Sequence, residues 1–445
     1  MRNESCDIFC NVVDNYGDIG VCWRLARQLA NEHGLAIRLW VDDLASFHRL
    51  CPEADVSLER QFCRGVQLGH GAAKPSGAGA TALHPLPQSA GFASNVSGMQ
   101  LGHGAAKPSG AGATALHPLP QSAGFASNVS GVQVWHWAAD FPAVEPAGLV
   151  IEAFACSLPQ SYVTAMAALQ RKPVWINLEY LSAEDWVEGC HKLPSPHPHL
   201  PLTKYFFFPG FTERTGGLLL ERDLLARRDA FQSDGAAQQR YWRGLGVQER
   251  MAGELRVSLF GYENEAMDAL LGCWEKGAYP LTCLLPEGRS LPQVAAYFGQ
   301  ATGKAGDIWQ RGHLRVHVLP FVEQEHYDEL LWACDVNLVR GEDSCVRAQW
   351  AAKPFIWQIY PQHDGVHLTK LEALRARYTA GLPPETAQSV RDLWLAWNGG
   401  PDIGGAWAHF VAQHGVLAGH GKEWADRLAN NNLALNLLDF YRQTD

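Results

Sequence analysis

The 445-residue sequence lacks the features typical of membrane, nucleic-acid-binding and secreted proteins. No uninterrupted apolar run reaches ~18 residues, the length that a transmembrane helix requires. Its 36 Lys and Arg residues are outnumbered by 46 Asp and Glu residues, and a net charge of -10 argues against a general nucleic-acid binder. Residues 1–7 include Glu4 and Asp7, where a signal peptide would be basic and then apolar. We therefore expect a cytoplasmic protein that binds neither membranes nor nucleic acid.

Several metal-binding and nucleotide-binding patterns are also missing. The 11 cysteines include no Cys-X-X-Cys pair, so we expect reduced, mostly buried thiols. The absence of Asp-X-Asp removes the ligand set of metal-dependent glycosyltransferases, and no P-loop motif occurs. His191, His197 and His199 resemble a metal tract, but no Cys or acidic residue completes a ligand set there. We expect no metal and no bound cofactor.

Residues 65–130 form a tandem repeat. The segment from Gly65 to Ser97 recurs as Gly98 to Ser130, and the two copies differ only at Val66 and Met99. The 33-residue period matches that of ankyrin repeats, but each copy has six glycines, three prolines and no amphipathic helical pattern. Such a composition cannot offset its ordering entropy, so we expect a mobile insertion without a role in the chemistry.

Outside the repeat, short apolar strands alternate with helical periodicity, which predicts an α/β fold with parallel sheets. The predicted strands of the first half are Ile8–Val13, Ile37–Val41, Val132–Trp135, Leu149–Phe154 and Val174–Leu178. Those of the second half are Leu255–Phe260, Leu281–Leu285, Leu314–Leu319, Val336–Val339 and Phe355–Ile359. We expect two Rossmann-like domains, residues 1–205 and 206–420, facing a central cleft. A C-terminal helix within 421–445 is expected to pack back on the first domain.

A polar turn follows the first strand. The segment Asp14–Gly20 has two carboxylates four residues apart, and its two glycines could let a ligand approach the backbone closely. In the simpler interpretation the segment is a turn in which Asp18 caps the following helix. In the functional one, Asp14 and Asp18 supply a general base and the group that orients it.

A second motif, Arg340-Gly341-Glu342-Asp343-Ser344, occupies the matching position in the second half. Asp343 or Ser344 could simply cap the next helix. Alternatively, the backbone N–H groups at the helix start hold a diphosphate, with Arg340 as a charged clamp. Acidic groups would repel that diphosphate, so Glu342 or Asp343 should then face the sugar hydroxyls of a nucleoside.

Two domains of this kind are the architecture of many nucleotide-sugar glycosyltransferases, although the fold alone does not determine the chemistry. Phe260 ends a predicted strand and either stacks on a base or packs in the core. A non-catalytic binding module would keep Phe260 and Arg340 but would have no use for Asp18. A dehydrogenase is disfavoured because the first turn lacks Gly-X-Gly-X-X-Gly.

Three motifs together resemble one family. The segments Asp7–Ala26, Arg340–Ser344 and Phe355–Gln362 closely resemble the bacterial protein-arginine rhamnosyltransferases that modify translation elongation factor P. The resemblance covers essentially the whole chain except residues 65–130. It implies a GT-B fold and a metal-independent reaction that inverts the anomeric centre. The enzyme would transfer rhamnose from the co-substrate dTDP-β-L-rhamnose to one arginine of the factor. The modified factor would then be active in the rescue of ribosomes stalled at polyproline.

The resemblance also implies roles for individual residues. Asp18 would be the catalytic base, with Asp14 as its neighbour. The donor-binding residues would be Asn15, Tyr16, Gly17, Phe260, Arg340, Glu342, Asp343 and Ser344. We expect a monomer whose partners are elongation factor P and dTDP-rhamnose. The alternative is a non-catalytic protein that binds a nucleotide sugar or a translation factor.

Overall fold

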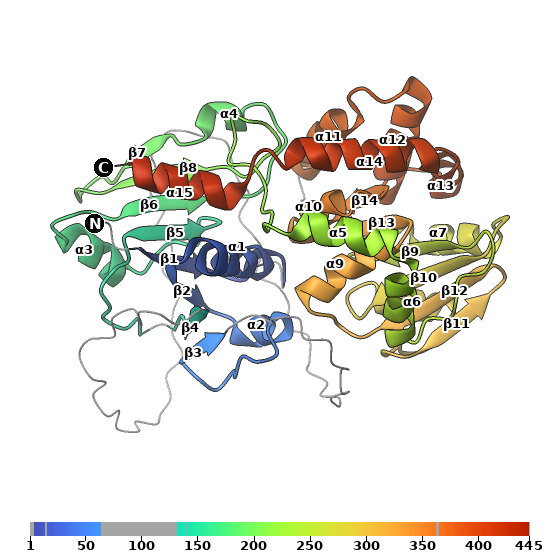
Figure 1. Cartoon of the computed structure of the whole chain (residues 1–445), viewed down its shortest axis with the longest axis horizontal. Helices are drawn as coiled ribbons and strands as arrows, with labels where there is room; N and C mark the ends of the chain where they lie inside the picture. The colour runs from blue at the N-terminus through green and yellow to red at the C-terminus, as the bar shows by residue number, and fades with distance from the viewer. Residues whose placement is uncertain (1–3, 14–15, 64–130, 139, 362–364, 445) are drawn as a thin grey trace. The chain divides into compact units, whose positions relative to one another are not determined.

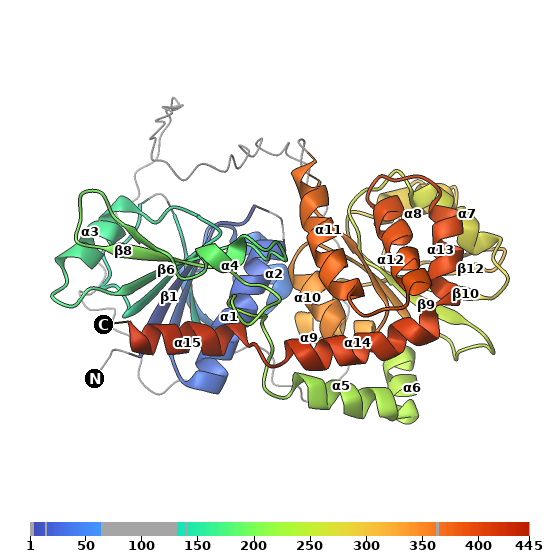
Figure 2. The ribbon, with the colours of Figure 1, turned by 90° about the horizontal axis from the view of Figure 1, so that it is seen from above.

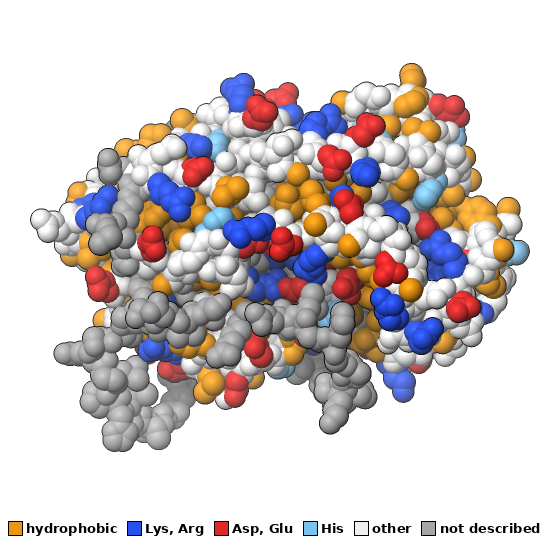
Figure 3. Space-filling model, viewed as in Figure 1, with side chains coloured by type: hydrophobic (Ala, Val, Ile, Leu, Met, Phe, Trp, Pro, Cys, Tyr) orange, Lys and Arg blue, Asp and Glu red, His pale blue; other side chains and the backbone are white. Residues whose placement is uncertain are grey.

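The computed structural model describes residues 4–13, 16–63, 131–138, 140–361 and 365–444, all within one compact unit of the chain (Figure 1). The repeat insertion, Asp14 and Asn15 lie outside the described residues, so the expectations for them are not addressed by the structure. On the face shown in Figure 3, basic and acidic side chains are interspersed.

Among the described residues, the first domain has an eight-stranded sheet in the order β3-β4-β2-β1-β5-β6-β8-β7. Its strands are β1 (Ser5–Cys10), β2 (Ala36–Val41), β3 (Arg60–Cys63), β4 (Val132–His136), β5 (Leu149–Ala153), β6 (Val174–Leu178), β7 (Pro194–Pro196) and β8 (Thr203–Phe207). The edge strands β3 and β7 are antiparallel to their neighbours and the other pairs are parallel. Its helices are α1 (Gly17–His33), α2 (Leu44–Leu50), α3 (Gln160–Ala168) and α4 (Val187–Cys190).

The second domain has a six-stranded sheet in the order β11-β12-β10-β9-β13-β14 within the described residues. Its strands are β9 (Leu255–Leu259), β10 (Leu281–Pro286), β11 (Ile308–Arg311), β12 (Leu314–Leu319), β13 (Val336–Arg340) and β14 (Phe355–Gln358). The helices from here to the C-terminus are α5 (Leu224–Ser233), α6 (Gly235–Gly244), α7 (Met267–Glu275), α8 (Leu291–Tyr297), α9 (Gln324–Ala333), α10 (Asp343–Trp350), α11 (Val366–Thr379), α12 (Pro384–Trp397), α13 (Ile403–Ala412), α14 (His414–Leu428) and α15 (Leu433–Gln443).

The predicted strands are present because most of their residues are buried, although the first runs from Ser5 to Cys10 rather than from Ile8 to Val13, and Val13 is 60% exposed. Every residue of β1, β5, β6, β10, β13 and β14 is buried, the pattern of parallel strands covered on both faces. The boundary expected between residues 205 and 206 instead divides β8, which pairs with β6. Phe207 at the end of β8 is fully buried in the first core, so the first sheet extends to that residue.

Two C-terminal helices, rather than one, link the domains (Figure 2). Helix α14 packs on the second domain through Leu417 and Trp424. Helix α15 packs on the first domain through Leu437 and Leu438. The side chain of Asn432 accepts hydrogen bonds from two backbone N–H groups and thereby starts α15 as a separate helix.

None of the helices in the described part of the chain is both long enough and apolar enough to cross a membrane.

Candidate active site

The two motifs lie where each sheet reverses its strand order. In the first sheet the chain builds outward from β1 through β2 to β4 and then returns to β5 on the other side of β1. In the second sheet β9 has the same position between β10 and β13. Ligands of doubly wound sheets bind at the carboxyl ends of the strands beside this switch point. Phe260 follows β9 and Arg340 ends β13, and the backbone N–H of Phe260 donates to Leu338 at 3.0 Å.

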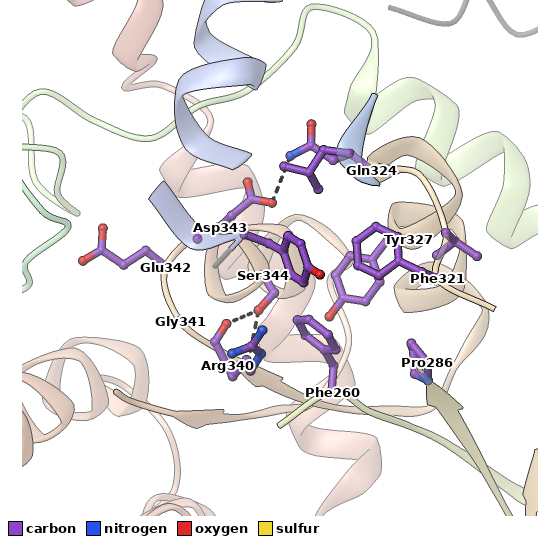
Figure 4. A pocket seen from close by; sticks show the side chains of 14 residues that line it. Phe260, Pro286, Phe321, Gln324, Tyr327, Arg340, Gly341, Glu342, Asp343 and Ser344 are labelled. Atoms are coloured by element: carbon purple, nitrogen blue, oxygen red, sulfur yellow. Dashed lines mark hydrogen bonds between the residues drawn. The ribbon is translucent and has the colours of Figure 1, made fainter. Parts of the chain in front are cut away.

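One pocket takes residues from both switch points and encloses about 620 Å³, part of it open to solvent. Its lining residues are Tyr16, Gly17, Leu50, Phe260, Pro286, Phe321, Val322, Gln324, Tyr327, Arg340, Gly341, Glu342, Asp343 and Ser344 (Figure 4). The structure thus brings together every donor-binding residue expected from the sequence except Asn15, which is not described.

Arg340 is held between two aromatic rings. Its guanidinium carbon lies 4.7 Å from the ring centroid of Phe260 and 4.5 Å from that of Tyr262. The Ser344 hydroxyl accepts the backbone N–H of Arg340 at 3.1 Å and donates to its carbonyl oxygen. The cation–π contacts hold the guanidinium in place, and Arg340 lines the pocket. Arg340 therefore presents a positive charge at the pocket wall.

The start of α10 adds a second electropositive element. The helix begins at Asp343, two residues after Gly341, whose φ of 62° is a left-handed value that favours glycine. The Trp357 indole N–H donates to the Gly341 carbonyl at 2.7 Å and fixes this turn. The first N–H groups of a helix have no partners within it and carry the positive end of its dipole, so this end of the pocket suits an anion.

The two acidic residues of the motif contact the first domain. Glu342 points away from the aromatic rings in Figure 4, and its Oε2 accepts the backbone N–H of Leu181 at 2.9 Å. Asp343 accepts the Arg24 Nε–H at 2.9 Å. Burial raises the pKa of the Asp343 carboxyl, although Arg24 and Arg347 lower it. Both carboxylates therefore join the domains, a role that the sequence did not indicate.

On the first-domain side, the helix start presents Tyr16 and Gly17 to the pocket. The Tyr16 ring packs on that of Phe321, with centroids 5.0 Å apart. The prediction that Asp18 caps α1 is wrong: Tyr16 is the N-cap, and Asp18 lies in the first turn. Asp18 is buried, and its Oδ2 accepts the Val13 backbone N–H at 2.9 Å, which ties the turn to the end of the strand.

A buried ion-pair network that the sequence did not indicate connects the domains next to the pocket, which Asp343 also lines. Arg24 contacts Asp328 and Glu221 in addition to Asp343, and Arg347 contacts the same Asp328 and Glu221. Both arginine side chains are 1% exposed. The partners of Arg24 are 197 to 319 residues away in the sequence, so no local pattern could reveal them.

Gly20 brings α1 close to the second domain. A Cβ atom at this position would lie 3.2 Å from Gln324 Nε2 and 3.6 Å from Asp343 Oδ2. The Gln324 amide donates to the Gly20 carbonyl at 3.1 Å. The sequence suggested that a ligand approaches the Gly20 backbone closely. In the structure, side chains of the second domain make this close approach instead. Phe321 and Gln324, also missed as pocket residues, follow a correctly predicted strand, and their place after its carboxyl end was the available signal.

Two doubly wound domains with a shared pocket at their switch points define the GT-B class of glycosyltransferases. The family model described as "Elongation-Factor P (EF-P) rhamnosyltransferase EarP" matches residues 6–82 and 112–442. The chain belongs to this family.

Relatives and a solved structure agree with the family. The chain is 44% identical over 439 residues to a protein-arginine rhamnosyltransferase of Pseudomonas putida and 43% identical over 438 residues to that of Pseudomonas aeruginosa, with 98% of each chain covered. A protein of the same name from Neisseria meningitidis is 35% identical over 399 residues, 89% of this chain and 84% of that one. A structure described as "Structural basis for EarP-mediated arginine glycosylation of translation elongation factor EF-P" is 32% identical, covers 99% of both chains and has a TM-score of 0.61.

Proposed function

We propose that this chain transfers rhamnose from dTDP-β-L-rhamnose to an arginine side chain of translation elongation factor P, with inversion at the anomeric carbon. Family membership supports the reaction class. The observation that carries the proposal is the pocket in which Arg340 and the start of α10 face the helix start that bears Asp18. The lining residues on this side are Tyr16 and Gly17, next to Asp18 in the sequence. The proposal sets the Asp18 carboxylate opposite the anion site, as transfer from a nucleotide sugar requires.

The second domain would bind the donor. Arg340 and the N–H groups at the start of α10 would contact the diphosphate, and charge-assisted hydrogen bonds of this kind are the stronger ones. Phe260 is half-buried and lines the pocket, so its ring can stack on the thymine base. Ser344 would act by orienting the Arg340 backbone.

The first domain would activate the acceptor. A guanidinium has a pKa above about 12 and delocalised lone pairs, so it is a poor nucleophile until a base polarises or removes a proton. Asp18 would take that proton while the nitrogen forms a bond to the anomeric carbon and the bond from this carbon to the dTDP oxygen breaks. The Val13 N–H fixes the Asp18 carboxylate in one orientation. Asp14, four residues earlier, would assist.

Charge that develops on the departing diphosphate would be stabilised by Arg340 and the α10 amides, so the proposed reaction needs no metal and no cofactor. A translation factor as acceptor places the reaction in the cytoplasm, with the modified factor acting on ribosomes stalled at polyproline. We propose that the enzyme works as a monomer.

The test is incubation of the purified chain with elongation factor P and dTDP-rhamnose. Intact mass spectrometry should show one added deoxyhexosyl group, fragmentation should place it on arginine, and NMR should show the α-anomer. Activity should persist in EDTA. A factor that stays unmodified, while calorimetry shows that the chain binds dTDP-rhamnose, would establish a non-catalytic binding protein instead.

A further inference from the structure

Two thiols and a carboxylate from separate elements of the first domain meet beside the point where the repeat insertion leaves the sheet. Cys51 follows the last residue of α2, Glu53 is in the loop after it, and Cys63 ends β3. One ligand atom from each residue lies within 4.8 Å of the other two. This cluster is separate from the pocket described above, and the proposed transfer uses none of its residues.

The three groups differ in their access to solvent. Cys51 is 4% exposed and Cys63 is fully buried, whereas Glu53 is exposed. The two cysteine residues are therefore shielded from solvent, whereas the glutamate is accessible to it. An ion can enter from the solvent side and can keep a water molecule there.

The separation of one pair of ligand atoms is close to that of tetrahedral coordination. Cys51 Sγ lies 3.7 Å from Glu53 Oε1. Bond lengths of about 2.3 Å from zinc to sulfur and about 2.1 Å from zinc to a carboxylate oxygen, at a tetrahedral angle, separate the two ligand atoms by about 3.6 Å. Because the two atoms already lie at nearly this separation, an ion can bind them with little rearrangement.

We propose that Cys51, Glu53 and Cys63 bind one zinc ion, with a water molecule as the fourth ligand. Two thiolates favour zinc over magnesium or calcium, which prefer oxygen ligands. On binding, two sulfur–zinc bonds and one oxygen–zinc bond form, and the two thiol protons pass to solvent.

The ion ties the end of α2 to the end of β3. Cys63 lies opposite Val132 of β4 in the sheet, so the ion anchors the strand pair from which residues 64–130 depart. Leu50, next to Cys51, lines the catalytic pocket. Zinc therefore stabilises a part of the first domain that reaches from the root of the insertion to the pocket wall.

Metal titration of the full chain tests the proposal. The protein is reduced with a phosphine, stripped with a chelator and titrated with Zn²⁺ against a chromophoric competitor, and one ion should bind per chain. Co²⁺ should give the near-ultraviolet charge-transfer band of thiolate ligation. Cys51→Ser and Cys63→Ser should each weaken zinc binding by at least about 100-fold, because loss of a direct ligand exceeds the 10- to 100-fold cost of losing a residue that only supports one. Glu53→Gln should weaken it about ten-fold only, because the amide oxygen can still bind the ion although it carries no charge.

Cys190→Ser is the matched control, since Cys190 is a partly exposed thiol in another part of the same domain, and this variant should bind zinc as the wild type does. If the serine variants fail to fold, peptide mapping of the wild type replaces them: zinc should protect Cys51 and Cys63, but not Cys190, from alkylation. The proposal is overturned if the reduced wild type binds no zinc, or if zinc leaves the alkylation of both cysteines unchanged. It is equally overturned if protein purified without reductant contains a Cys51–Cys63 disulfide and no zinc.

Discussion

Arg24 in α1 of the first domain donates its Nε–H to Asp343 Oδ1 in α10 of the second domain, at 2.9 Å. Asp343 belongs to the Arg340–Ser344 motif and Arg24 lies six residues after Asp18 in α1, so this ion pair connects the two sides of the pocket. A residue of the proposed acceptor side thus positions the helix that begins the proposed donor site.

Arg24→Met should destabilise the protein substantially. The change leaves the buried Asp328 and the partly buried Asp343 with one fewer cation, and breaking a buried ion pair costs about 3–5 kcal/mol. Urea unfolding should show a clearly lower midpoint. Arg442→Met is the control, because the Arg442–Asp439 pair is exposed and the midpoint should barely move. An Arg24→Met variant as stable as the control would show that the network does not stabilise the fold.

Asp18→Asn should lower rhamnosyl transfer by about 10²- to 10⁴-fold, the usual cost of losing a general base. Donor affinity should stay within a few-fold, since the amide oxygen can still accept the Val13 N–H that the carboxylate binds. Single-turnover transfer and calorimetry with dTDP-rhamnose separate the two effects. Asp185→Asn, at a 97% exposed carboxylate, should leave both unchanged. Wild-type turnover by Asp18→Asn would contradict the assignment of the base.

Arg340→Ala should weaken binding of dTDP and dTDP-rhamnose alike, because its proposed partner is the diphosphate that they share. Loss of a charged hydrogen-bond pair costs about 1.5–3 kcal/mol, which is a loss of affinity of about ten- to a hundred-fold. Calorimetry with dTDP measures it. Arg311→Ala is the control, because that guanidinium packs on Tyr297, outside the pocket. An unchanged dTDP affinity would make the Arg340 role purely structural.

Deletion of residues 65–130, which joins Arg64 to Gly131, should retain fold and activity and increase resistance to proteolysis. Strands β3 and β4 are antiparallel, and Cys63 lies opposite Val132, so the deletion closes them with a two-residue loop that ends in glycine. Loops of this length are common in β-hairpins, and glycine suits them. Circular dichroism, limited proteolysis and transfer assays check the variant. A folded variant without activity would instead assign the repeat a function.

His191 should make stability depend on pH. Burial and the adjacent Lys192 lower its pKa to about 4, and its Nδ1 accepts the Phe208 backbone N–H at 3.1 Å. The pKa in the unfolded chain is about 6.5, so between these values the unfolded state binds a proton that the folded state does not. The contribution of His191 is thus present above about pH 6.5 and is lost as the pH falls toward 4.

His191→Gln should accordingly lose less stability than the wild type when the pH is lowered from 7 to 5, as measured by urea midpoints at each pH. His313→Gln, at an exposed histidine, should follow the wild type. Identical pH profiles for wild type and His191→Gln would show that this histidine is not the cause.

Much of the fold could be read from local patterns. The apolar runs predicted the strands because most of their residues are buried, and alternation with helices predicted the parallel order. The Asp14–Gly20 and Arg340–Ser344 segments could be predicted as site motifs because each lies near the carboxyl end of a predicted strand. The detail of the turn could not be predicted in this way. Asp18 was expected to cap the helix, but its carboxylate accepts the backbone N–H of Val13.

The sequence by itself determined the elements, the family and the two motifs, since these depend on residues close together in the chain. Only the tertiary structure decided which distant groups meet: Arg24 with Asp343, and Cys51 with Cys63. The sequence around a single arginine or cysteine does not indicate its partner, because the partner depends on the strand order and on how the domains pack together. Those contacts are therefore decided by the packing of the whole chain.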